Sequence, residues 1–154
     1  MGRKRMNIPV AKILSARNTF IMEGKSYHAY CLYLKGRRKE ARNILIREHF
    51  DTYYGKTRNI TTDTMVKEMY LELGATKPIN YMDSDPGIVL KVVAQRVDVY
   101  LKQFEDFQQN GYKETTAIKM SPKGENFILR SCGENKCIAM AALGNEFMPG
   151  VVLL

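Results

Sequence analysis

The clearest pattern of apolar positions lies between Pro86 and Gln109, where they recur at steps of three and four residues. This spacing places them on one face of an α-helix. Asp85 is a favourable N-cap residue, proline is favourable at the first helical position, and the Asn110-Gly111 pair ends the pattern. The sequence therefore predicts a long central helix whose core face carries Val89, Val92, Val93, Val97, Tyr100, Leu101 and Phe104.

The segments Thr19–Met22 and Tyr27–Leu34 are rich in aromatic and apolar residues, as strands are. Gly24 lies between them, where a tight turn needs a positive φ. The pattern predicts a β-hairpin, and period-two alternation assigns a core face to His28, Tyr30, Leu32 and Leu34. A short helix is expected before the hairpin, from Pro9 to about Arg17.

Two further helices are predicted between this hairpin and the central helix. The first, Arg37–Tyr54, is bounded by glycines and has an apolar arc made of Ala41, Ile44 and Leu45. The second, Asp63–Leu73, follows threonines that can cap its first turn. A basic loop at residues 56–59 and a connection at 75–86, which contains two prolines, separate these helices.

The last forty residues have the short apolar runs and turn compositions of an all-β segment. Thr115–Met120, Asn126–Cys132 and Cys137–Leu143 are separated by segments rich in Gly, Pro, Ser and Asn. They predict an antiparallel meander, and the final VVLL is expected to form a closing edge strand.

These patterns predict a single α+β domain over residues 8–154, preceded by a flexible basic arm at residues 1–7. The domain has an N-terminal β-hairpin, three helices with a long central core helix, and a C-terminal antiparallel β-meander. A chain of 154 residues is long enough to bury one apolar core.

Positive charge is concentrated at one end of the chain. Residues 1–58 hold 14 Lys and Arg against four acidic residues, a surplus of +10, whereas the whole chain carries +8. A one-sided surplus attracts polyanions or acidic surfaces, although the same charge also keeps a protein soluble without any partner.

The helix Arg37–Tyr54 has a basic arc made of Arg38, Lys39 and Arg42, with few acidic residues nearby to neutralise it. Such an arc suits phosphate contacts, because arginine and lysine bind phosphate oxygens. The sequence predicts a non-catalytic regulatory or accessory protein that binds DNA or RNA. The predicted contacts are Arg3, Lys4, Arg5, Lys35, Arg37, Arg38, Lys39, Arg42, Arg47, Lys56 and Arg58.

Two other functions fit the same charge. One is a protein-binding module, an inhibitor or assembly subunit, that docks an acidic protein surface and uses its nine methionines as an adaptable apolar interface. The other is a Mg²⁺-dependent nuclease whose oxygen ligands are Glu48, Asp51, Asp83 and Asp85. Capping, turn and surface roles explain these four carboxylates without a metal.

Neither a metal nor a cofactor is predicted. A zinc site would have to combine His28, Cys31, Cys132 and Cys137, yet His28 and Cys31 point to opposite faces of the strand predicted there. No glycine-rich phosphate loop is present. Three cysteines, an odd count, favour a reducing intracellular location in the cytoplasm or nucleus, and no segment is apolar for long enough to span a membrane.

Overall fold

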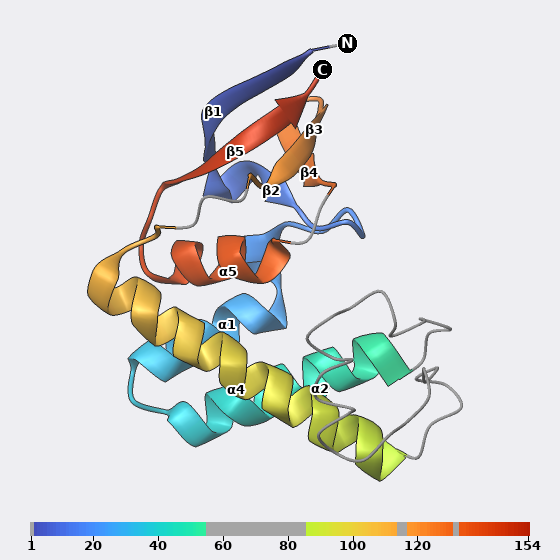
Figure 1. The fold of residues 1–154 in the computed structure, drawn as a ribbon, viewed down its shortest axis with the longest axis vertical. Coiled ribbons are helices and arrows are strands. Elements are labelled where there is room, and N and C mark those ends of the chain that lie inside the picture. Colours follow the sequence, from blue (N-terminus) through green and yellow to red (C-terminus); the bar gives the residue numbers. More distant parts are fainter. Residues whose placement is uncertain (1, 55–85, 114–116, 131–132) are drawn as a thin grey trace. The chain divides into compact units, whose positions relative to one another are not determined.

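The computed structural model describes residues 2–54, 86–113, 117–130 and 133–154 (Figure 1). These residues form one mixed sheet of five strands and four α-helices, so the α+β class is confirmed, with four helices where three were predicted. The predicted helix Asp63–Leu73 and the segments on both sides of it lie outside the described residues. In chain order the elements are β1 (Arg3–Pro9), η1 (Val10–Lys12), β2 (Ile13–Leu14), η2 (Ile21–Glu23), α1 (Lys25–Leu34), α2 (Arg38–Tyr54), α4 (Pro86–Asn110), β3 (Lys119–Lys123), β4 (Asn126–Leu129), α5 (Glu134–Ala142) and β5 (Phe147–Leu153).

Contacts between residues divide the chain into two compact units, which are described separately. The first unit comprises residues 1–41 and 104–154, and the second comprises residues 42–103. The boundaries fall inside α2 and α4. The prediction of a single domain over residues 8–154 stays a prediction.

The sheet of the first unit has the strand order β1-β5-β3-β4-β2. β1 runs antiparallel to β5 and β3 antiparallel to β4, whereas β3 is parallel to β5 and β2 is parallel to β4. The predicted closing strand at the end of the chain is therefore an inner strand, placed between β1 and β3. Val151 and Val152, adjacent residues that point to opposite faces, are both buried, as expected for an inner strand.

The sequence predicts a flexible arm over residues 1–7, but the structure places Arg3–Asn7 in β1. The strand pairs with β5 along its whole length, from Arg3 opposite Leu153 to Pro9 opposite Phe147. Ile8 anchors it, because its side chain is fully buried. The strand was not predicted because its basic residues do not form the apolar pattern of a strand. Backbone pairing nevertheless tolerates polar side chains on an exposed strand. The short helix predicted from Pro9 is reduced to the single 3₁₀ turn η1, followed by β2.

The predicted N-terminal hairpin is wrong. Residues 21–23 form the 3₁₀ turn η2, and Lys25–Leu34 form helix α1, with Gly24 at its N-cap. The buried residues of α1 are Ala29, Tyr30, Leu32 and Tyr33. Their spacing is helical, whereas the predicted core face had period two and included Leu34, which is exposed. The segment also contains no Val, Ile or Thr, the β-branched residues that favour strands over helices.

The first hairpin of the predicted C-terminal meander is present, but its first strand is shifted: β3 is Lys119–Lys123, where Thr115–Met120 was predicted and residues 121–125 were assigned to the turn. β3 and β4 form an antiparallel hairpin in which Lys123 pairs with Asn126 across a turn at Gly124. The third predicted strand, Cys137–Leu143, lies in α5 and the turn after it, and this prediction is wrong. Its three alanines favour a helix, and the five consecutive residues from Cys137 to Ala141 are all buried, so burial in this run does not alternate as it would in a strand with one buried face.

The core of the first unit contains an aromatic cluster. The ring of Tyr30 lies 4.6 Å from that of Phe104, and the ring of Tyr33 meets Phe104 edge-on at 5.9 Å between centroids. Tyr30 and Phe104 are fully buried. The hydroxyl of Tyr30 donates a 2.5 Å hydrogen bond to Oδ1 of Asn135 at the start of α5. The cluster thus joins α1 to the last turns of α4 and to α5.

The second unit contains the paired parts of α2 and α4, and both predicted helices are confirmed. Leu45 of α2 and Val92, Val93 and Val97 of α4 are fully buried. Beside them the ring of His49 lies 5.4 Å from that of Tyr100, whose hydroxyl accepts a 2.7 Å hydrogen bond from Nε of Arg96. Among the described helices, none is long and apolar enough to cross a membrane.

We expect Gly150→Ala to destabilise the first unit. An added Cβ would lie 2.7 Å from Cδ1 of the buried Ile8 side chain and 3.2 Å from the backbone oxygen of Ile118, so the Ile8 side chain or the backbone at Ile118 would have to shift. Overpacking of this kind costs about 1 to 3 kcal/mol. Urea denaturation measures the loss, with Gly2→Ala as the control, because its Cβ would meet nothing closer than 3.9 Å. Equal stability of the two variants would contradict the packing described for β5.

We expect His49 to make stability fall with acid. Burial, aided by the positive charge of Arg96, lowers the pKa of His49 from 6.5 to about 4. Between pH 6.5 and about 4, His49 is therefore protonated in the unfolded chain but neutral in the folded chain. Folding stability is lost as the pH falls through this range toward 4. The full effect is about 3 kcal/mol.

Urea denaturation of the wild type and of His49→Gln from pH 7.5 to 4 measures this loss. The stability difference between the two proteins should shift by that amount in favour of the variant on acidification. His28→Gln, which removes the exposed histidine, is the matched control. A difference that stays constant with pH would show that His49 ionises normally in the folded protein.

Candidate nucleic-acid interface

The basic residues of the first unit are densest at the turn between α1 and α2. Gly36 has a φ of +87°, which glycine adopts without strain and which ends α1. The amide of Arg37 donates to the carbonyl of Leu32 and the amide of Gly36 donates to that of Tyr33, at 3.1 Å each. These two hydrogen bonds form the Schellman motif, which commonly ends helices. The turn is therefore held by backbone bonds, which leaves its side chains available.

Four cations project from this turn and form the turn cluster. All four are exposed, and two of them, Lys35 and Lys39, have no partner among the described residues. Arg37 forms an ion pair with Glu40, with both side chains about half exposed. The guanidinium of Arg38 lies 5.1 Å from the ring centroid of Tyr33. The turn cluster consists of Lys35, Arg37, Arg38 and Lys39.

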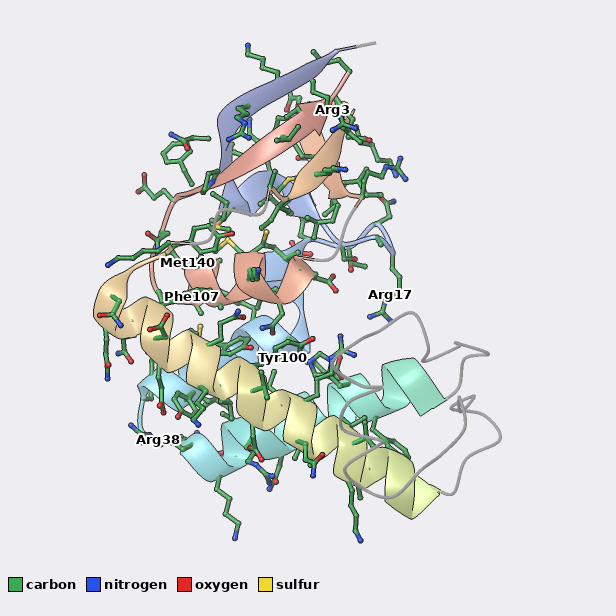
Figure 2. The ribbon with its side chains drawn as sticks, in the orientation of Figure 1. Arg3, Arg17, Arg38, Tyr100, Phe107 and Met140 are labelled. Carbon is green, nitrogen blue, oxygen red and sulfur yellow. The ribbon has the colours of Figure 1, made fainter. Side chains whose placement is uncertain are left out.

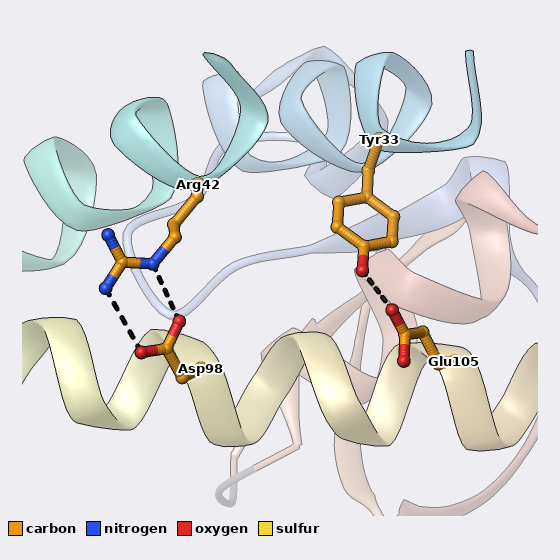
Figure 3. Close-up of polar contacts among 4 residues, drawn as sticks. All are labelled: Tyr33, Arg42, Asp98 and Glu105. Carbon is orange, nitrogen blue, oxygen red and sulfur yellow. Dashed lines mark hydrogen bonds and ion pairs between the residues drawn. The ribbon is translucent and has the colours of Figure 1, made fainter. Parts of the chain in front are cut away.

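Tyr33 connects the turn cluster to the core. Its hydroxyl donates a hydrogen bond to Oε1 of Glu105 on α4 (Figure 3), and only 9% of its surface is exposed. Burial is the main cause that raises the pKa of Tyr33, and the hydrogen bond to Glu105 raises it further. The phenol therefore stays neutral, and its fixed ring provides a cation–π contact that restricts the position of Arg38.

Arg42, predicted to be unpaired, is instead bound to a carboxylate. Its Nε lies 2.7 Å from Oδ1 of Asp98, and its Nη2 lies 3.1 Å from Oδ2, a bidentate pair within the second unit (Figure 3). The hydrogen bonds to Asp98 raise the pKa of Arg42. The prediction missed this pair because Asp98 is 56 residues away in the sequence. Arg42 is therefore a poorer phosphate ligand than its position suggested.

The other predicted contacts do not gather around the turn cluster. Arg3, Lys4 and Arg5 are exposed on β1, and Figure 2 places Arg3 and Arg38 at opposite ends of the first unit. Arg47 is exposed on the part of α2 that belongs to the second unit. Lys56 and Arg58 lie outside the described residues. The predicted set thus separates into several surfaces.

The described residues contain no group of three metal-ligating side chains. Cys137 is buried in α5, and burial raises the pKa of its thiol to about 12, which disfavours the thiolate that binds zinc. His28 and Cys31 lie on helix α1, so the argument from opposite strand faces does not apply to them. Cys132, Asp83 and Asp85 lie outside the described residues, as does the side chain of Asp51.

Of the methionines described in the first unit, Met6 and Met22 are half-buried and three are buried, so the methionine interface stays a prediction. Met120 and Met148 are fully buried, and Met140 is 6% exposed. Met140 and Met148 form part of the wall of a groove of about 610 Å³ at one end of α4, α5 and β5. The groove is lined by Leu34, Phe107, Gln108, Gly111, Tyr112, Met140, Leu143, Asn145, Phe147, Met148 and Pro149.

The sequence reasoning missed Tyr33, Asp98 and Glu105. The three tyrosines of α1 are spaced three residues apart, which is a helical signal that the strand interpretation overlooked. Asp98 and Glu105 are seven residues apart, a spacing that places two carboxylates on one face of the predicted central helix. That face could have been proposed as the counterpart of the basic helix.

The chain was compared with protein-family models, with curated proteins and with solved structures, and it matches none of them. Its function must therefore be inferred from its own side chains.

We expect the pair between Arg42 and Asp98 to contribute little to stability. Its side chains are 40% and 54% exposed, and exposed ion pairs contribute about 0.2 to 1 kcal/mol. A double-mutant cycle with Arg42→Ala and Asp98→Ala, measured by urea denaturation at low and high salt, gives the coupling energy. A coupling well above 1 kcal/mol that salt does not reduce would show that the pair is shielded from solvent.

Proposed function

We propose that the protein binds nucleic acid without catalysing a reaction on it, and that the turn cluster contacts the phosphate backbone. The observation that carries this proposal is the exposure of four cations within five consecutive residues, Lys35 to Lys39, at a rigid turn. The activity fits a small regulatory or accessory protein whose affinity comes mainly from phosphate contacts.

The surroundings of the four cations support phosphate as the ligand. Lys35 and Lys39 have no competing carboxylate within the described chain. The ring of Tyr33 restrains the guanidinium of Arg38 before any ligand arrives, which lowers the entropy lost on binding. Arg37 is paired with Glu40, but an exposed pair of this kind is weak enough for a phosphate to replace the carboxylate.

Arg42 is left out of the proposed contact set because Asp98 already occupies its guanidinium in a bidentate geometry. This changes the expected salt dependence. Four phosphate contacts imply a slope of log K against log salt of about −3 to −4, a smaller slope than the eleven predicted cations would give.

Removing Lys35 and Lys39, which have no partner in the described part of the chain, should weaken binding and lower its salt dependence. We expect Lys35→Ala with Lys39→Ala to reduce the magnitude of the salt slope by about 2. Fluorescence anisotropy over a salt series, with single- and double-stranded DNA and RNA as probes, measures both quantities. Lys12→Ala with Arg17→Ala is the matched control, since it removes the same charge from two exposed residues elsewhere in the first unit.

Equal loss in the two double variants would show that net charge, not the turn cluster, determines binding. Absence of binding near 50 mM salt would refute the proposed function. Repeating the assay with Mg²⁺ tests the nuclease alternative, because cleavage that requires the metal would replace a non-catalytic role with a catalytic one.

A further inference from the structure

Strand β1 lies at the edge of the sheet, with β5 on its one paired side (Figure 1). Its register determines which backbone groups that pairing uses. The amide of Leu154 donates to the carbonyl of Gly2, and the amide of Val10 donates to that of Glu146, at 2.9 Å each. In an antiparallel pair, hydrogen-bonded residues alternate with residues whose backbone groups point away. The even-numbered residues of β1 therefore bond to β5.

The odd-numbered residues of β1 consequently direct their amides and carbonyls toward the unpaired side. These residues are Arg3, Arg5 and Asn7, all exposed, and in the described part of the chain no other backbone group pairs with them. The strand ends at Pro9, which has no amide to donate. β1 thus offers a short row of three donors and three acceptors to a further strand.

The side chains of this edge also alternate. Ile8, an even-numbered residue, is fully buried, so the even-numbered side chains face the core side of the sheet. Arg3 and Arg5 therefore lie two residues apart on the opposite face, beside the free backbone groups. Neither guanidinium has a partner among the described residues.

We propose that the free edge of β1 binds an extended peptide with carboxylates at alternate positions, which adds to the sheet as a sixth strand. A residue directly opposite Arg3 or Arg5 would place its side chain on the same face as the guanidinium. Acidic residues two apart can therefore pair with both arginines while the peptide backbone bonds to the edge.

The charge of the edge argues against the other occupants. A second copy of the chain would bring another Arg3, Lys4 and Arg5 to the same edge, and this added positive charge disfavours pairing between copies. A phosphate backbone offers acceptors to the edge amides but no donors to the edge carbonyls, so it would leave half of the row unpaired. An acidic peptide satisfies donors, acceptors and charge together.

The binding test uses a short fluorescent peptide that alternates Glu and Thr, with a Gln-for-Glu peptide as its uncharged counterpart. We expect Arg3→Gln with Arg5→Gln to weaken binding about tenfold, as the loss of two exposed charge pairs predicts. Lys4→Gln is the matched control, because its side chain lies on the other face and its backbone already bonds to β5. It should weaken binding by less than about twofold.

The backbone test removes a single donor. Asn7→Pro deletes the outward amide without touching a bond to β5, so binding should fall while thermal stability is retained. Hydrogen exchange gives a second readout that needs no variant. On peptide binding the amides of Arg3, Arg5 and Asn7 should gain protection, while those of Lys4, Met6 and Ile8 are protected throughout.

Binding without new protection at the odd-numbered amides would overturn strand addition, as would equal losses in the Lys4 and arginine variants. If the peptide does not bind at low salt, the proposal is refuted, and the role left for the edge cations is to prevent pairing between copies of the chain. An oligonucleotide that competes with the peptide and protects the same amides would replace the acidic peptide as occupant. Failure of the peptide to bind leaves the proposed function unaffected, because that function depends on the turn cluster.

Discussion

The packing of two α1 tyrosines on Phe104 holds the first unit together. Phe104 lies in the last turns of α4, so this contact determines where α1 ends relative to that helix. The hydroxyl of each tyrosine also donates a hydrogen bond to a polar partner, Asn135 for Tyr30 and Glu105 for Tyr33. Buried tyrosines need such partners, because an unbonded hydroxyl in a core costs free energy. These buried contacts fix the end of α1 and therefore the position of the turn cluster that follows it.

The pairing of β1 with β5 determines the other charged surface. It brings basic residues near the start of the sequence onto a sheet whose inner strands come from the last forty residues. Because alternate residues of an antiparallel strand face opposite ways, one register fixes both the free backbone groups and the face that carries Arg3 and Arg5. The same cations that discourage pairing between copies provide complementarity to an acidic strand.

Elements with strong periodicity were predictable from the sequence, and those with mixed signals were not. Helices α2 and α4 have clear boundaries at glycine or proline. The glycine turn of the β3–β4 hairpin was also predicted, although β3 lies three to four residues later than its predicted position. Helix α1 was misread because tyrosines are common in strands, although its buried residues follow the helical period. Helix α5 was misread because a short apolar run fits either structure, and its alanines were given too little weight. For β1, long-range pairing with β5 outweighed a polar sequence that predicts no structure.

The candidate site shows how net charge differs from available charge. A count along the sequence assigns Arg42 and Arg38 the same role, but tertiary structure separates them. A carboxylate 56 residues away occupies Arg42, whereas Arg38 contacts an aromatic ring and has no ion pair with a carboxylate among the described residues. Pairing with Asp98 lowers the affinity of Arg42 for a phosphate, since the phosphate must displace a bidentate carboxylate. Contact with Tyr33 has no such cost, because a cation–π contact and a phosphate use different parts of the guanidinium. The fold thus decides which arginines of the basic helix can bind a phosphate, because it places a carboxylate against Arg42 and an aromatic ring against Arg38.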